Sequence, residues 1–196
     1  MTTSPLALWH DEHIKFVGLL DLLQREIDTF RGGETPHYDL MIDILNYLRD
    51  YADCVHHPRE DIAFRQLEVR CTALAPQISR LLQEHRVITW AGEELLTQLK
   101  AAAADVVLPR SALETAASRY IRIYRDHLNA EESQILPMAR VLLVDEDWAL
   151  LADSEAAVAD PLFGSQVAER FKRLRRQIDL QSPRARSQAL YGDARS

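Results

Sequence analysis

The sequence predicts an all-α protein built on an up-down-up-down antiparallel four-helix bundle. Only 6 glycines and 8 prolines occur among the 196 residues, which favours long regular elements. Apolar residues recur at steps of three and four in four long segments, as the buried face of an α-helix requires. Short turns separate these segments, and four long helices joined by short turns pack most simply in alternating directions.

The starts of the four segments carry residues that initiate helices. Ser-Pro at residues 4–5 and Thr-Pro at residues 35–36 each place an N-cap residue before a proline at the first helical position. Pro76 and Pro109 mark the starts of the third and fourth segments. The glycine pair within residues 31–34 separates the first segment from the second. We therefore expect helices over residues 5–31, 36–71, 76–104 and 110–143.

The last quarter of the chain has weaker signals. The acidic start "DED" predicts a fifth helix over residues 145–158, and the turn-like "DPLFG" precedes a sixth over 165–180. These helices are expected to form an extension, residues 144–181, that packs on the bundle of residues 5–143. Residues 182–196 contain few core-forming side chains, so we expect them to be disordered.

The composition narrows the classes of partner. The net charge of −7 argues against nucleic acid, which needs clustered positive charge. The two cysteines are isolated in the sequence, which favours a reducing compartment and hence a cytoplasmic protein. We find neither a signal-peptide pattern nor a run of 18 apolar residues, so no membrane association is expected. The composition leaves monomer and dimer equally open.

Histidines and glutamates interrupt the apolar stripes. Every predicted bundle helix carries a histidine on its stripe, and two helices carry a glutamate four residues later, which is about 400° of helical rotation and therefore the same side. The histidines lie at similar distances from the turns, so in antiparallel hairpins they should meet at one depth. Buried carboxylates need a cation, and the nearby arginines lie off the stripes. The pattern predicts metal ligands at His13, His56, Glu60, His85, His127 and Glu131.

The ligand types limit the choice of metal. Imidazole and carboxylate groups suit iron, manganese, zinc or copper, and no cysteine belongs to the set. Six groups exceed what one tetrahedral zinc ion needs. They fit two adjacent metal ions in the core of a helical bundle, an arrangement that recurs in di-iron proteins.

Four stretches of the sequence, "DEHIKF", "HHPRE", "QEHRVI" and "HLNAEESQILP", resemble the metal-binding helices of the hemerythrin family. The resemblance is to the bacterial HHE cation-binding branch and covers about residues 5–143. It implies a non-haem di-iron protein whose two iron ions share an oxo or hydroxo bridge, with Glu60 and Glu131 as bridging ligands.

The resemblance also implies a function. Such a protein binds or reacts with oxygen, nitric oxide or peroxide, in sensing, detoxification or iron handling. Whether this chain turns over a substrate as an enzyme stays open. The alternative is a metal-stabilised helical interaction module without redox turnover.

The third helix departs from the pattern of the oxygen-carrying hemerythrins. They have a second histidine one turn further on, where this chain has Thr89. His10, His57, Glu84 or water could take its place, or the position could stay without a ligand. By stripe phase His57 and its neighbour Asp61 point aside, although a helix kink at Pro58 could turn His57 inward. Tyr124, three residues before His127, is a candidate hydrogen-bond donor to a metal-bound ligand.

Overall fold

The computed structural model describes residues 4–154 and 158–181, and its regular elements in these ranges are all helical. The predicted all-α class is thus confirmed. The α-helices are α1 (Pro5–Arg31), α2 (Tyr38–Tyr47), α3 (His57–Arg70), α4 (Ala75–Ala103), α5 (Arg110–Ala130), α6 (Leu136–Leu142), α7 (Asp145–Ser154) and α8 (Lys172–Gln181). Two π-helical segments, η1 (Leu48–His56) and η3 (Glu131–Ile135), and two 3-10 turns, η2 (Thr72–Leu74) and η4 (Glu169–Phe171), complete the set.

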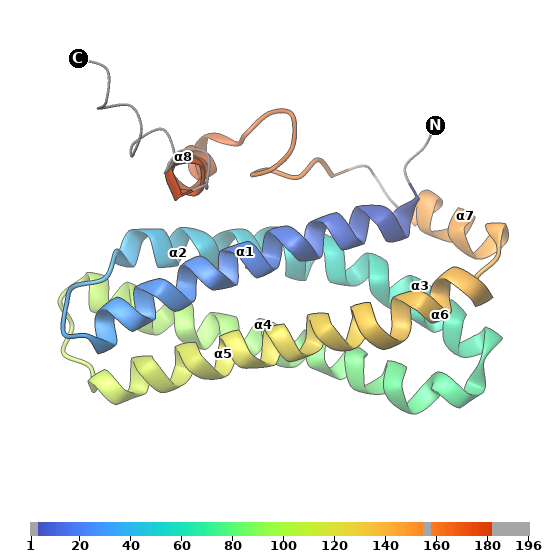
Figure 1. Ribbon diagram of the computed structural model, residues 1–196, viewed down its shortest axis with the longest axis horizontal. Helices are drawn as coiled ribbons and strands as arrows, with labels where there is room; N and C mark the ends of the chain where they lie inside the picture. The colour runs from blue at the N-terminus through green and yellow to red at the C-terminus, as the bar shows by residue number, and fades with distance from the viewer. Residues whose placement is uncertain (1–3, 155–157, 182–196) are drawn as a thin grey trace, which may run out of the picture. The chain divides into compact units, whose positions relative to one another are not determined.

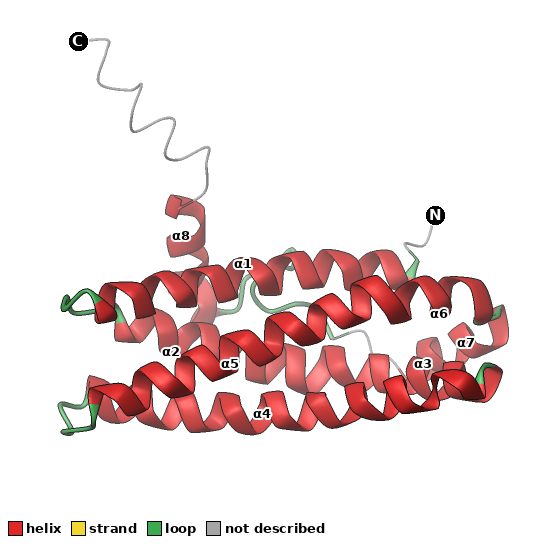
Figure 2. Cartoon of the chain, turned by 60° about the horizontal axis from the view of Figure 1, so that its bottom comes forward, coloured by secondary structure: helices red, strands yellow, loops and turns green. Residues whose placement is uncertain are grey.

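Four long helical segments lie side by side in the bundle (Figure 1). They are α1, the run α2–η1–α3, α4, and the run α5–η3–α6. Helix α1 contacts α2 and α5, and α4 also contacts both, so the four segments occupy the corners of a square. The loops at residues 32–37 and 104–109 lie at one end of the bundle and η2 lies at the other (Figure 2).

The second and fourth segments are not continuous α-helices, contrary to the prediction. The π-helical segments η1 and η3 interrupt them, and each is followed by a proline at the second position of the next α-helix, Pro58 and Pro137. Before each proline, a backbone N–H reaches back five residues, from His57 to Ala52 and from Leu136 to Glu131.

Proline chemistry accounts for this position. A proline has no N–H, and its ring clashes with the carbonyl four residues earlier in an α-helix. A wider π turn before the proline accommodates both defects without ending the helix. The kink expected at Pro58 therefore takes the form of a π-helix that precedes it.

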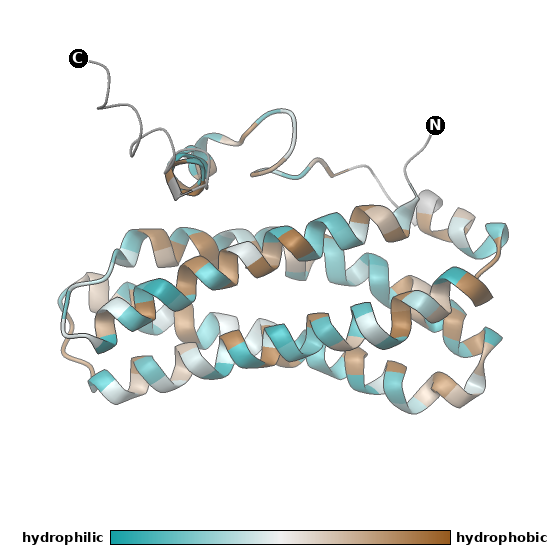
Figure 3. Cartoon of the chain, in the orientation of Figure 1, coloured by the Kyte–Doolittle hydropathy of each residue, from teal (hydrophilic) through white to brown (hydrophobic). Residues whose placement is uncertain are grey.

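Apolar layers enclose a polar layer in the middle of the bundle. On α1, Leu6 and Trp9 precede His13, and Phe16 and Leu20 follow it, and all five side chains are buried. One apolar cluster fills the end formed by α3, α6 and α7, and includes Trp9, Phe64, Leu67, Ile78, Leu81 and Leu151. Hydrophobic and hydrophilic residues alternate along every bundle helix in Figure 3, as amphipathic packing requires.

The chain divides into two compact units, Met1–Val158 and Ala159–Ser196. Helix α7 belongs to the first unit, where Arg70 donates two hydrogen bonds to Asp147, at 3.0 and 3.1 Å, and Trp148 lies against Trp9. Helix α8 belongs to the second unit. The expected extension, residues 144–181, is therefore divided between the two units.

Three remaining expectations have different outcomes. The packing of residues 144–181 on the bundle stays a prediction, and the disorder expected for 182–196 concerns residues outside the described ranges. Within those ranges, no helix combines the length and the apolar character needed to cross a membrane.

Candidate metal centre

Seven polar side chains form a buried layer between the apolar layers. Every corner of the bundle contributes to it: α1, the η1–α3 junction, α4, and the α5–η3 junction. The seven residues are His13, His56, His57, Glu60, His85, His127 and Glu131. The six predicted ligands are therefore together in one layer, and His57 joins them.

One half of the layer lies between α1 and the second segment. The Nε2 atoms of His13 and His56 are 3.0 Å apart. The Oε1 atom of Glu60 lies 3.2 Å from His13 Nε2, and its Oε2 atom lies 3.2 Å from His56 Nε2. One ligand atom from each residue falls within 4.8 Å of the others, which suits a single cation.

The other half contains three histidines. His57, His85 and His127 offer ligand atoms within 4.8 Å of one another, and the rings of His57 and His85 are stacked with centroids 4.2 Å apart. The Oε1 atom of Glu131 lies 3.2 Å from His127 Nε2 and 3.3 Å from His85 Nε2.

The two glutamates lie between these halves. The other oxygen of Glu131 is 3.6 Å from His13 Nε2, and Oε2 of Glu60 is 3.7 Å from His85 Nε2. Each carboxylate thus faces histidines of both halves. This is the position that a carboxylate shared by two cations would occupy.

The structure decides between the two expectations for His57. Stripe phase alone turns it aside, but it is buried in the centre, as a kink at Pro58 would allow. The reason is η1, because the π turns before His57 shift the helical phase and bring two successive histidines to the inner face. Burial and the neighbouring His85 and His56 hold the pKa of His57 well below the ordinary value, so its ring stays neutral, as a metal ligand must be.

Four carboxylates outside the layer hold the Nδ1–H groups of four histidines. Glu12 accepts from His56 at 2.7 Å, and Asp61 accepts from His85 at 2.6 Å. Glu84 accepts from His127 at 3.1 Å, and Glu132 accepts from His13 at 2.7 Å. These four residues are called the carboxylate ring below. An imidazole that donates from Nδ1 presents the lone pair of Nε2 to a metal, so the ring orients these histidines as ligands.

The hydrogen bonds of the carboxylate ring run around the bundle in one direction. The first segment supplies the carboxylate for a histidine of the second, the second for the third, the third for the fourth, and the fourth for the first. Each carboxylate is adjacent in sequence to an inward residue: Glu12 to His13, Asp61 to Glu60, Glu84 to His85, and Glu132 to Glu131.

Helix geometry explains the direction. One residue along a helix rotates the side chain by about 100°, from the centre toward a neighbouring helix. The carboxylate precedes the inward residue in the first and third segments and follows it in the second and fourth. In segments of opposite direction, these two steps give the same sense of rotation around the bundle.

The apolar stripes do not predict most of the carboxylate ring. By stripe phase Asp61 points aside and Glu84 is only a substitute ligand, whereas each accepts a hydrogen bond from a histidine of the next segment. The available signal was a carboxylate beside an inward residue in every helix. It could not be recognised without knowing which helices are neighbours.

The layer also contains polar atoms that lack hydrogen bonds. In the part of the chain that the structure describes, these include both ring nitrogens of His57, Nε2 of His127, and Oε2 of Glu60 and of Glu131. Buried polar atoms without partners are rare in folded proteins. Cations bound in the layer would be ligated by one ring nitrogen of His57 and by the other three atoms, so the residues present fit a metal centre.

Charges in the layer are strongly coupled. Burial and Glu60 raise the pKa of Glu131, but His127 and His85 outweigh them and leave it at about 2. Burial lowers the pKa of His13, but Glu132 and Glu60 outweigh it and raise it to about 10. The carboxylates are therefore ionised and ready to bind a cation.

Two further candidates lie outside the layer. His10 is exposed and bonds to Glu132 at 3.0 Å, so it does not take the place of the missing histidine. Tyr124 is buried with its ring centroid 6.0 Å from that of His57, and its hydroxyl has no hydrogen-bond partner among the described residues. At the position of the missing histidine, the Thr89 hydroxyl donates to the carbonyl of His85.

A layer of imidazole and carboxylate groups inside a helical bundle defines a class, the metal-binding helical proteins. Comparison with known families agrees, since the model of the hemerythrin HHE cation-binding domain matches residues 4–139. The chain therefore belongs to the hemerythrin HHE cation-binding family. No curated protein and no solved structure matches it.

Proposed function

We propose that this chain is a cytoplasmic, hemerythrin-like, non-haem di-iron protein that binds or reacts with oxygen, nitric oxide or peroxide. Sensing, detoxification and iron handling are the roles that suit such a centre. The observation that carries the proposal is the convergence of five histidines and two glutamates in one buried layer, with ligand atoms left unpartnered.

The donor set divides between two ions. His13 and His56 would hold one ion, and His57, His85 and His127 the other, with Glu60 and Glu131 shared between them. Iron favours this mixture of imidazole and carboxylate, and manganese and zinc are its competitors. A pair of iron ions would supply the binding of small ligands and the exchange of electrons with them.

The chain's own residues prepare the site. The carboxylate ring fixes the orientation of four imidazole side chains before any metal binds. This reduces the entropy that metal binding would otherwise cost. The apolar layers exclude water from the centre, which strengthens electrostatic interactions there. Tyr124 offers the one hydroxyl known to be both buried and unpartnered within the described ranges, and it is suited to donate a hydrogen bond to a bound ligand.

Metal analysis with optical spectroscopy tests the proposal. The purified protein, loaded anaerobically with ferrous iron, should hold two ions per chain and develop iron charge-transfer absorption in air. Consumption of peroxide or nitric oxide over many turnovers would identify an enzyme, and stoichiometric binding a carrier or sensor. A protein that holds no iron and shows no such absorption would rule the proposal out.

A further inference from the structure

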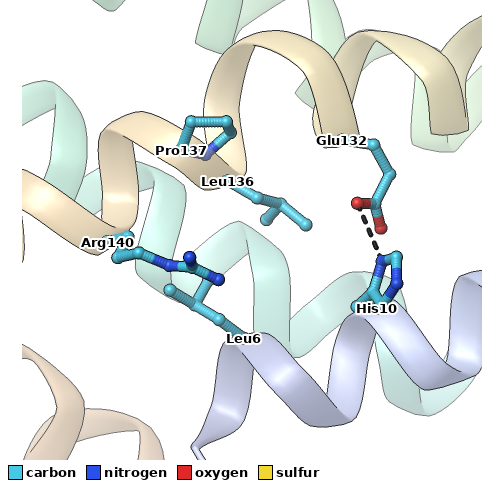
Figure 4. A pocket seen from close by; sticks show the side chains of 6 residues that line it. All are labelled: Leu6, His10, Glu132, Leu136, Pro137 and Arg140. Carbon is cyan, nitrogen blue, oxygen red and sulfur yellow. Dashed lines mark hydrogen bonds and ion pairs between the residues drawn. The ribbon is translucent and has the colours of Figure 1, made fainter.

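His10 and Glu132 form an imidazole–carboxylate pair at the surface above the buried layer. Nδ1 of His10 donates to Oε2 of Glu132 at 3.0 Å, and the His10 side chain is 57% exposed. Figure 4 shows the two side chains facing each other across the gap between α1 and the last bundle segment. Imidazole and carboxylate are the same two ligand types that form the centre beneath.

Glu132 also connects this pair to the centre. Its Oε1 atom accepts a hydrogen bond from Nδ1 of His13 at 2.7 Å, while Oε2 faces His10. A single carboxylate therefore spans from an exposed imidazole to a buried one. His10 and His13 lie three residues apart on α1, so both rings point to the same side of the helix.

Two hollows flank the pair and give it access to solvent. One, of about 310 Å³, is lined by His10 and Glu132 together with Leu6, Leu136, Pro137 and Arg140, with Arg140 at the end away from His10 (Figure 4). The other, of about 460 Å³, is also lined by His10 and Glu132 and reaches His13. Arg125 lines the second hollow, and its charge is offset by Asp21 at 2.6 Å.

Two other members of the carboxylate ring, Glu12 and Glu84, are less suited than Glu132 to receive a cation from solvent. Glu12 is buried and also accepts a hydrogen bond from Tyr51 at 2.6 Å. Glu84 is paired with Arg80 at 3.2 Å, and that positive charge repels a metal ion. Glu132 combines partial exposure with a neighbouring imidazole that can act as a second ligand.

We propose that His10 and Glu132 form the loading site at which a divalent metal ion first binds before it passes to His13 and the buried centre. This inference rests on the proposed function, because it assumes that the centre holds metal. Two protein ligands at a partly exposed site hold an ion weakly, so the six or seven ligands of the centre withdraw it. His10 then affects the rate of loading and leaves the final metal content unchanged.

Stopped-flow mixing of the metal-free protein with Co²⁺ tests the proposal, because the visible spectrum of Co²⁺ reports its binding to imidazole. His10→Ala is expected to slow the binding phase severalfold, because it removes one of the two ligands of the loading site. The final Co²⁺ content should equal that of the unchanged protein. His37→Ala is the matched control, since His37 is 80% exposed and pairs with Glu26 at 3.2 Å far along α1 from the centre.

A second variant separates metal binding from hydrogen bonding. His10→Gln can still donate to Glu132 but is a poor metal ligand, so it should be as slow as His10→Ala. Equal rates for His10→Ala and the unchanged protein, or a fast His10→Gln, would overturn the loading site. A lower final content in His10→Ala would also overturn it, because His10 would then be a ligand of the centre. If the unchanged protein itself binds no metal, the proposed function fails instead.

Discussion

Glu12 orients a histidine of the centre, although the pattern of apolar stripes gives no sign of this role. Glu12 lies beside His13 on α1, yet it serves His56 on the neighbouring segment. It is buried, and burial raises its pKa, but the hydrogen bond and charge of His56 and the hydroxyl of Tyr51 lower it below the ordinary value. Its carboxylate is therefore ionised and aligns His56 for a metal.

Replacing Glu12 should weaken the centre without removing a ligand. Glu12→Gln retains the volume and loses the charge, so we expect about 10- to 100-fold weaker iron affinity, the usual effect of losing such a partner. Asp11→Asn is the matched control, because Asp11 is adjacent in sequence but exposed. Competition with a chelator of known affinity measures both, and equal affinities in the two variants would contradict the role of Glu12.

At the scale of elements, the π-helical segments determine which residues reach the centre. η1 lies before His57 and changes its phase, whereas η3 begins at Glu131, after His127. Each of the two π-helical segments precedes a proline, but they differ in which inward residues they affect. Only η1 lies at or before all three inward residues of its segment, because it ends at His56 and is followed by His57 and Glu60.

This difference predicts unequal effects of two similar substitutions. Pro58→Ala restores an N–H and removes the ring clash, which favours a regular α-helix and turns His57 away from the centre. We expect this variant to lose at least about tenfold in affinity for the second metal ion. Pro137→Ala should have little effect, because no ligand follows η3. Metal titration followed by optical spectroscopy compares them, and equal binding by both variants would show that η1 persists without Pro58.

At the scale of the whole molecule, the buried histidines make the stability of the metal-free protein depend on pH. Burial lowers the pKa of His85, but Asp61 and Glu131 outweigh it and raise it to about 10, and His13 behaves likewise. The pKa values of His56 and His127 are also raised, mainly by Glu60 and Glu131 against the effect of burial. Groups with a raised pKa stabilise the fold while they are protonated.

The sign of the pH dependence follows from these shifts. The stabilisation is complete below the ordinary histidine pKa of 6.5 and is lost as the pH rises through about 10. Thermal unfolding of the metal-free protein should therefore occur at progressively lower temperature between these two values. With metal bound, the ion replaces the protons on Nε2 and the decline should be much smaller. Equal pH profiles for the two forms would contradict this account.

The sequence by itself determined the helical class, the bundle segments and six of the seven inward side chains of the polar layer. These features depend on local periodicity and on distance from the turns, which a single chain displays directly. Spacing of four residues placed His56 with Glu60 and His127 with Glu131, and the structure brings both pairs into one layer.

Only the tertiary structure decided the place of His57 and the partners of the carboxylate ring. The phase of His57 depends on a π-helix, whose wider turns leave no periodic signature in the sequence. The partner of each ring carboxylate lies on the next helix, so it depends on which helices are neighbours and on the direction in which they turn. Such contacts join residues far apart in the chain, and they become determined only when the helices pack.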